Sequence, residues 1–220
     1  MPITKRRRVL FLALGVKIEY TDMYDDLICK IKQKTILQET NIALMAIEDL
    51  ESPLHAVFVN SEVLTQTCYI PTWNAVINYV QKGGTAICIG DFSNTKECLE
   101  SRPVRNPFSA AGLLWKFDEK HHATVYLNRE YIPLSESRVE ALPQSYDTHA
   151  VFLRNVDTKD AWYRPTEVDI TNLDVVEAGH VNPFSFSVAM TEVGDGKLGY
   201  VGDIGPGTPI SVIMAMTGLD

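Results

Sequence analysis

Cysteine is scarce in this sequence, and no two cysteines have the spacing of a metal or redox motif. A chain of 220 residues with 45% apolar side chains can bury a core that needs no cross-links. We therefore expect free thiols in a reducing compartment, and a cytoplasmic location. The four cysteines are Cys29, Cys68, Cys88 and Cys98.

Long apolar runs are also missing. No run approaches the ~20 apolar residues that a membrane helix needs, so we expect no membrane partner. The basic run Lys5–Arg8 precedes the apolar run Val9–Val16, which is the order found in a signal peptide. That apolar run is short, however, and no small-x-small cleavage site follows it, so we do not interpret it as a secretion signal.

Positively charged residues are fewer than negatively charged ones. The sequence has 20 lysines and arginines against 28 aspartates and glutamates, which gives a formal net charge of −8. Nucleic-acid binding depends on a broad cationic surface that releases counterions, and this composition does not provide one. Internal repeats and low-complexity tracts are absent as well. The composition excludes a disordered, collagen-like or coiled-coil chain and indicates a globular protein.

Three continuous apolar runs, each closed by a glycine or an asparagine, dominate the first ninety residues. They are Arg8–Gly15, His55–Asn60 and Thr85–Gly90, and strands buried on both faces of a parallel sheet have this pattern. Helical periodicity over residues 22–34, 41–50 and 73–80, with a short strand at 35–39, separates the runs. The alternation predicts a three-layer α/β sandwich with a flavodoxin-like, mostly parallel central sheet.

The second half of the chain is rich in short strands. We expect a final helix capped by Thr208, with Pro209 in its first turn and Gly218 at its end. The whole chain, residues 1–220, is predicted as one domain with a strand-rich elaboration at about 123–193. The expected strands are Ala123–Asn128, His149–Val156, Val175–Gly179, Phe184–Val193 and Lys197–Ile204.

Several motifs resemble those of a known superfamily. Tyr79–Gly84 before a buried strand, and Gly196–Gly202 later, resemble the class I glutamine amidotransferase-like superfamily, and within it the trehalose-utilisation-type proteins and a group of uncharacterised fungal proteins. The resemblance implies one domain of that fold, with a site at the turn near Gly90 and no established reaction for the fungal group. The motifs of the fungal likeness are Gly90-x-Phe92-Ser93, Ala111-Gly112-Leu113-x-Trp115, Leu142-Pro143-x-Ser145-Tyr146, Ala161-Trp162-Tyr163 and Gly199–Asp203.

The resemblance also implies what a catalytic version would need: a cysteine nucleophile on a strained strand-to-helix turn, a histidine base and an orienting glutamate. Ala86–Gly90 resembles the core of that nucleophile motif, which would make Cys88 the nucleophile. If the turn lies at Gly90–Asp91 instead, the strand has a normal length and Cys88 is buried. No histidine lies on the late strand, where this chain has Asp203.

The densest group of possible metal ligands is a pair of histidines that follows Asp118-Glu119-Lys120. His121 and His122 are adjacent, and adjacent side chains point apart on either a helix or a strand, so we expect no metal site. His122 is nevertheless the histidine we assign to the site if the protein is catalytic, because the fungal proteins that it resembles carry a histidine near that point. No motif indicates a cofactor.

Open α/β sheets bind ligands beyond the carboxyl ends of their strands. If the strand from Lys197 runs parallel to the strand from Thr85, this rule brings the turn after Gly90 and Asp203 to one edge. A polar ligand could then accept or donate hydrogen bonds there. The candidate ligand-binding residues are Gly15, Asn60, Ser61, Gly90, Asp91, Phe92, Ser93 and Asp203.

Two functions stay open from the sequence. The first is a non-canonical member of the superfamily that lacks the full triad and acts as a small-ligand binder or accessory subunit. The alternative is a cysteine-dependent hydrolase or amidotransferase that acts on a small polar molecule through Cys88. The partners expected are a small polar molecule or a protein, with a homodimer as one option.

Overall fold

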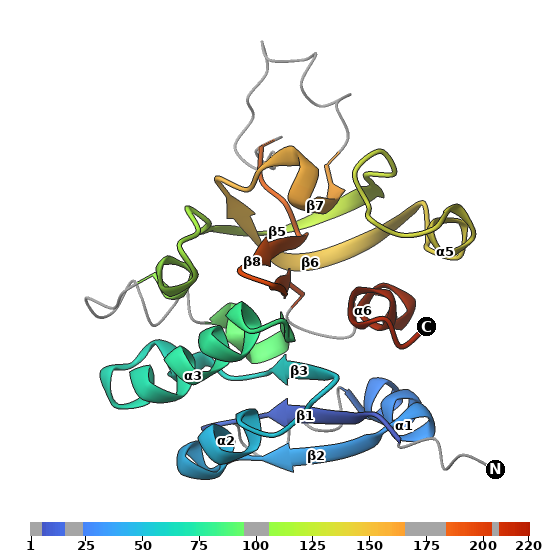
Figure 1. Ribbon diagram of the computed structural model, residues 1–220. Coiled ribbons are helices and arrows are strands. Elements are labelled where there is room, and N and C mark those ends of the chain that lie inside the picture. Colours follow the sequence, from blue (N-terminus) through green and yellow to red (C-terminus); the bar gives the residue numbers. More distant parts are fainter. Residues whose placement is uncertain (1–5, 16–23, 95–105, 166–183, 204–206) are drawn as a thin grey trace, which may run out of the picture.

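A computed structural model describes residues 6–15, 24–94, 106–165, 184–203 and 207–220. Nine strands form one mixed sheet in the order β2-β1-β3-β4-β9-β8-β7-β5-β6. In Figure 1 the first strands lie at the bottom and the later ones at the top. The strands are β1 (Arg8–Leu12), β2 (Ile36–Thr40), β3 (Ala56–Val59), β4 (Thr85–Cys88), β5 (Lys116–Leu127), β6 (Ser145–Arg154), β7 (Ala161–Arg164), β8 (Val188–Val193) and β9 (Gly196–Val201).

The first half of the sheet is parallel. β1 pairs with β2 and β3, β3 pairs with β4, and β4 pairs with β9, all in parallel. With β9 as the fifth strand, this is the 2-1-3-4-5 order of flavodoxin-like folds. Every residue of β3 is buried, as a strand covered on both faces requires. The predicted parallel sheet with helices on both faces is therefore confirmed.

Helices α1 (Asp25–Lys34) and α6 (Ile210–Thr217) cover one face of the sheet, and α2 (Ala43–Leu50) and α3 (Ile70–Gln81) cover the other (Figure 1). α1 has acidic residues in its first turn and basic residues in its last, which complements the helix dipole. After α3 the chain turns at Gly83, whose φ of 102° favours glycine. A short helix, α5 (Glu136–Glu140), precedes β6. Among the described residues, the helices are all too short or too polar to span a lipid bilayer.

The second half of the sheet is antiparallel. β9, β8, β7, β5 and β6 pair in that order, each antiparallel to its neighbour. β6, at the end of the strand order, also contacts the middle of the sheet. Ala150 forms a β-bridge with Asp203, which follows β9, and Leu153 forms one with Phe186, which precedes β8. These bridges place β6 across the carboxyl end of β9.

The sheet separates two apolar cores. The core under α2 and α3 contains a ring cluster in which Phe92, Phe108, Phe117 and Tyr200 lie with centroids 5.3–6.2 Å apart. The core under α1 and α6 contains Trp162 and side chains from β1, β3 and β4, such as Val9, Phe58 and Ile87. Both cores run through the parallel and the antiparallel strands, so the two halves share their packing.

Several predicted boundaries are wrong by a few residues. β5 begins at Lys116 rather than Ala123, and β6 begins at Ser145 rather than His149, because both strands have one exposed face whose polar residues hide the pattern. β8 begins at Val188 rather than Phe184. Thr208 is not the helix cap; Pro209 occupies that position, and the Thr208 hydroxyl donates to Asp203. The predicted strand Val175–Gly179 lies outside the described residues.

Candidate functional site

The carboxyl ends of the parallel strands bring the predicted turns together. β9 runs parallel to β4, so the condition for placing Asp203 at the same edge as Gly90 is confirmed. The side-chain Oδ1 of Asn60, after β3, accepts the backbone N–H of Asp91 at 2.8 Å, and the Ser61 hydroxyl donates to the carbonyl of Leu14 at 2.7 Å. Asn60 and Ser61 therefore connect the turns that follow β1, β3 and β4.

Gly90 occupies the tight turn after β4. Its φ is 54°, and a Cβ at this position would overlap the Tyr24 hydroxyl and the Asn60 side-chain oxygen. Both the backbone conformation and the space therefore require glycine. In the resemblance described above, the strained residue at this turn carries the nucleophile, and here that residue has no side chain.

Cys88 lies two residues earlier, inside β4. It is paired in register with Val59 on one side and Tyr200 on the other, and it is fully buried, as predicted. Burial raises the pKa of its thiol well above the ordinary value. The thiol is therefore protonated at neutral pH, while cysteine chemistry depends on the thiolate.

Asp203 is a buried carboxylate at this edge. It accepts hydrogen bonds from the hydroxyls of Thr148 on β6 and Thr208 before α6, and from the backbone N–H of His149. Burial nevertheless raises the pKa of the Asp203 carboxyl, although all three hydrogen bonds act to lower it. The antiparallel strand β6 thus supplies partners for an acid that the parallel strand β9 positions.

The Tyr24 hydroxyl lies within electrostatic reach of both Asp91 and Asp203. Burial raises the pKa of the Tyr24 hydroxyl, and the charges of Asp91 and Asp203 raise it further. The pKa of the Asp91 carboxyl is also raised, first by burial and then by Glu62. The Tyr24 hydroxyl therefore keeps its proton at neutral pH and can donate a hydrogen bond.

A cavity of about 270 Å³ opens between α1, α6 and this edge of the sheet. Two carboxylates and two hydroxyls contribute its polar surface, and leucine, isoleucine, valine and proline side chains contribute the rest. Among the described residues that line it there is no lysine, arginine or histidine. The lining residues are Tyr24, Asp26, Leu27, Ile89, Gly90, Val201, Asp203, Thr208, Pro209, Ile210 and Ile213.

Of the predicted ligand-binding residues, Gly90 and Asp203 line this cavity. Phe92 packs in the ring cluster on the other face, where its ring centroid is 5.4 Å from that of Trp73. The buried Ser93 donates to the carbonyl of Val201 and accepts from Tyr200. Gly15, with φ of 71°, packs against the Val63 side chain. These residues shape the turns around the cavity instead of lining it.

The predicted catalytic histidine lies elsewhere. His122 on β5 and His149 on β6 are exposed and stack with ring centroids 3.8 Å apart. His121 points the other way, towards Phe152, as adjacent residues on a strand do. His122 is thus at the surface and Cys88 in the core, so the structure does not bring them together. Within the described ranges no three histidine, cysteine, aspartate or glutamate side chains form a group suited to a metal ion.

Sequence reasoning missed the roles of Tyr24 and Thr208, which line the cavity, and of Thr148, which donates to its carboxylate. Tyr24 precedes α1 and follows residues that carry no local motif, and Thr148 reaches Asp203 because β6 bridges to Asp203 at Ala150. Thr208 was interpretable as a helix cap from its place before a proline. The sequence of β6 does contain a signal for Thr148. Buried and exposed residues alternate there, and Thr148 and Ala150 occupy buried positions.

No protein-family model matches this sequence, and no curated protein is similar to it. Solved structures do match its fold. A ThuA-like protein from Bacteroides uniformis superposes with a TM-score of 0.62 at 13% identity, covering 99% of this chain and 92% of that one. A ThuA-like protein from Parabacteroides merdae gives a TM-score of 0.53 at 12% identity, with 97% and 88% covered.

Part of a larger enzyme has the same fold. A β-galactosidase from the haloarchaeon Halorubrum lacusprofundi gives a TM-score of 0.57 at 12% identity, and this chain spans 96% of its own length but 30% of that enzyme. The chain therefore has the class I glutamine amidotransferase-like fold of ThuA-like proteins and of a β-galactosidase domain. These matches come from bacteria and an archaeon and give no support to the fungal likeness.

Proposed function

We propose that this protein binds a small polar molecule in the cavity between α1, α6 and the carboxyl ends of β4 and β9, without a cysteine-based reaction. The observation that carries the proposal is Gly90. It takes the strained position of the turn but has no side chain to act as nucleophile, while the buried Asp203 lines the cavity beside it. The protein is then a non-canonical member of its fold, a binder or an accessory subunit.

The lining favours a neutral or cationic ligand. Asp26 and Asp203 contribute negative charge, and no described lining residue opposes it. Hydroxyls on Tyr24 and Thr208 can pair with ligand hydroxyl or amino groups, and the apolar residues of α6 can cover a carbon skeleton. A monosaccharide-sized polyol or a small amino alcohol has this combination of groups. The β-galactosidase match makes sugars a natural class to include.

No observation favours the cysteine-dependent hydrolase or amidotransferase. Cys88 is buried in the sheet, its thiol pKa is raised, and the exposed His122 does not meet it. A reaction through Cys88 would require the central strand β4 to open.

The test is a ligand screen by saturation-transfer NMR with three sets of small molecules: monosaccharides and polyols, amino alcohols, and carboxylic acids of matched size. We expect binding from the first two sets. Ile210→Trp, which fills the cavity from the half-buried start of α6, should abolish it. Ile47→Trp is the matched control, because Ile47 is equally half-buried but lies between α2 and α3.

Asp203→Asn refines the screen, because an amide oxygen still accepts from Thr148 or Thr208 while the charge is lost. We expect about tenfold weaker binding of an amino alcohol and a smaller loss for a neutral polyol. Preferential binding of the carboxylic acids would overturn the proposal. So would a turnover of any of these compounds that Cys88→Ser removes.

A further inference from the structure

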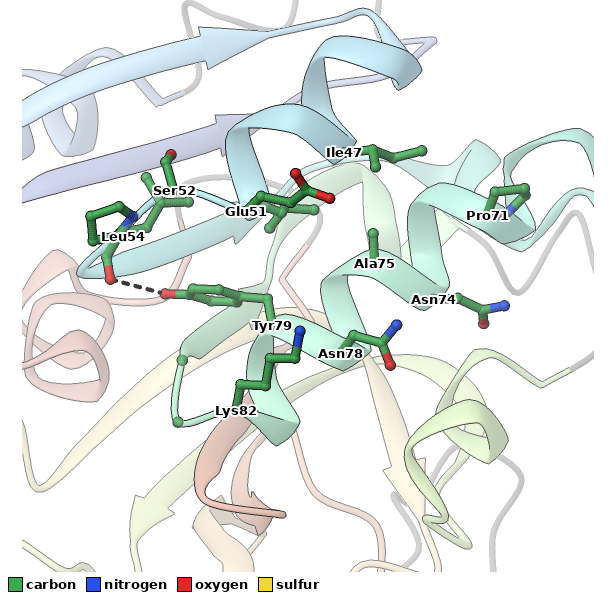
Figure 2. A pocket seen from close by; sticks show the side chains of 14 residues that line it. Ile47, Glu51, Ser52, Leu54, Pro71, Asn74, Ala75, Asn78, Tyr79 and Lys82 are labelled. Carbon is green, nitrogen blue, oxygen red and sulfur yellow. Dashed lines mark hydrogen bonds between the residues drawn. The ribbon is translucent and has the colours of Figure 1, made fainter.

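A second hollow lies on the opposite face of the sheet, between α2 and α3. This α2–α3 groove has a volume of about 840 Å³, and it is formed by α2, the segment 51–54 that precedes β3, and α3 with the turn that precedes β4. It therefore opens at the amino end of these strands, away from the cavity beside Asp203, and does not depend on the function proposed for that cavity. Figure 2 shows the side chains that line it.

The floor of the groove is apolar and fixed. Ile47 from α2 and Ala75 from α3 face the hollow, each half-buried. Beside them the ring of Tyr79 lies half-buried, with its hydroxyl donating to the carbonyl of Leu54 at 3.4 Å, a contact that Figure 2 marks. The backbone of Tyr79 is fixed in α3 and its hydroxyl is fixed by Leu54, so the ring between them is a preformed surface for an apolar group.

Two free carboxamides run along one wall. The side chains of Asn74 and Asn78 project from the same side of α3 and are exposed, and their carboxamides make no hydrogen bond with the described part of the chain (Figure 2). Four residues of helix rise about 6 Å. An extended chain repeats its outward-facing peptide groups every two residues, or about 6.6 Å. The two carboxamides are therefore spaced to pair with successive peptide groups of one extended strand, each offering a donor and an acceptor.

The hollow is also elongated. Asn74 lines a smaller pocket of about 140 Å³ as well, which continues the groove towards Asn106 and Pro107. Together they follow α3, whose twelve residues span about 18 Å, enough for about five residues of extended chain. At the other end Glu51 and Lys82 lie on either side of Tyr79 and give the groove one charge of each sign.

We propose that the α2–α3 groove binds an extended peptide segment of a partner protein. The backbone of the peptide pairs with Asn74 and Asn78, every second side chain is apolar and packs on the floor, and one acidic and one basic residue meet Lys82 and Glu51. An incoming helix fits this wall poorly, because its backbone groups are already bonded internally and would leave the two carboxamides unpaired.

The experiment uses a fluorescein-labelled heptapeptide in which leucine alternates with threonine over five residues, followed by a glutamate and a lysine. Fluorescence polarisation against the full chain should show saturable binding. Asn74→Ala and Asn78→Ala should each weaken it about fivefold, and the double variant more. Gln81→Ala is the matched control, because Gln81 is an exposed carboxamide on the same helix that does not line the groove, and it should leave binding unchanged.

Two isomeric peptides test whether the backbone is recognised. Each carries two N-methylated amides, on one edge of the extended chain in the first and on the other edge in the second. We expect one isomer to lose at least tenfold in affinity and the other to bind like the parent peptide. Ile47→Trp should abolish binding of all three by filling the groove, whereas Ile210→Trp, in the other cavity, should not.

Several outcomes would overturn the proposal. Equal affinities of the two N-methylated isomers would show that the peptide backbone is not read. An Asn74→Ala/Asn78→Ala variant that binds as well as Gln81→Ala would remove the carboxamides from the argument. A concentration-dependent dimer in sedimentation equilibrium that Ile47→Trp abolishes, with no peptide binding, would make a second copy of the chain the occupant.

Discussion

The parallel and antiparallel halves of the sheet differ in how their strands meet solvent. β3 and β4 are four residues each and almost wholly buried, whereas β5 runs for twelve residues with only two of them buried. The two halves nevertheless meet at the carboxylate of Asp203. Asp203 follows the parallel strand β9, and its carboxylate accepts a hydrogen bond from the hydroxyl of Thr148 on the antiparallel strand β6. Buried strands of the parallel half position the backbone turns of the cavity, and the partly exposed strand β6 of the antiparallel half supplies hydrogen bonds to its carboxylate.

The largest expected effect tests whether the two halves unfold together. Phe58 in β3 and Phe152 in β6 are both fully buried in the core under α1 and α6. Replacing either by alanine should cost about 3–5 kcal/mol of unfolding free energy. In urea, single-tryptophan proteins that report from Trp73 or Trp162 should give one coincident transition for both variants.

Two separate transitions, with each variant shifting only the one in its own half, would show that the halves are independent. A replacement of the exposed Tyr126 by alanine on β5 is the control, and it should move the midpoint little.

A smaller effect is expected where the halves join. A Cβ on Gly196, at the start of β9, would overlap the carbonyl oxygens of Val80 and Gly84. Gly196→Ala should therefore lower the unfolding free energy by about 3 kcal/mol, because the obstructing atoms are backbone. Gly112→Ala is the comparison: Gly112 has φ of 75° but open space around it, so only the backbone strain remains, about 1–2 kcal/mol. Equal losses in thermal or urea unfolding would contradict the steric account.

A pH-dependent effect should follow from Asp203. Burial raises the pKa of this carboxyl in the folded protein above its value in the unfolded chain. Unfolding then lets it ionise, so its contribution lowers the stability as the pH rises from the ordinary carboxyl range through the folded pKa. Urea unfolding from about pH 4 to about pH 7 should show a shallower decline in Asp203→Asn than in the wild type. An unaltered slope in Asp203→Asn would refute the assignment.

The smallest effect concerns accessibility instead of stability. Cys88 is buried in β4 with a raised thiol pKa, while Cys29 and Cys68 are exposed. Iodoacetamide at neutral pH should label the two exposed cysteines readily and Cys88 only as fast as the parallel half opens. Peptide mapping by mass spectrometry measures each rate, with the urea-unfolded chain as reference. Labelling of Cys88 at the rate of Cys29 would revive the cysteine-dependent function.

The central strands β1, β3 and β4 of the parallel half could be predicted from the sequence because each belongs to a continuous apolar run closed by a turn residue. The antiparallel half could be predicted only as strand-rich. Residues 116–124 of β5 carry charged and histidine side chains, and a strand with one solvated face has no run to mark where it begins. The pairing of the antiparallel strands depends on the register between segments that are distant in the sequence, and no local pattern encodes that register.

The site divides in the same way. Gly90 and Asp203 follow buried runs, so the rule for strand ends located them. Tyr24 lines the cavity and Thr148 donates to Asp203 only through tertiary packing, and their own neighbours in the sequence do not mark them. The α2–α3 groove was not predicted at all, because Asn74 and Asn78 look like ordinary exposed residues of an amphipathic helix until α2 is placed beside them.

β9 sits between β4 and β8, although β5 to β8 all come between β4 and β9 along the chain. A chain emerging from the ribosome can therefore assemble β1 to β4 early, but β4 keeps an unpaired edge until Gly196–Val201 has been synthesised. An open, apolar strand edge is a template for pairing with another chain. Translation that stalls before β9 thus leaves a fragment prone to aggregate. The tendency to aggregate during synthesis therefore depends on how soon β9 is made and pairs with β4.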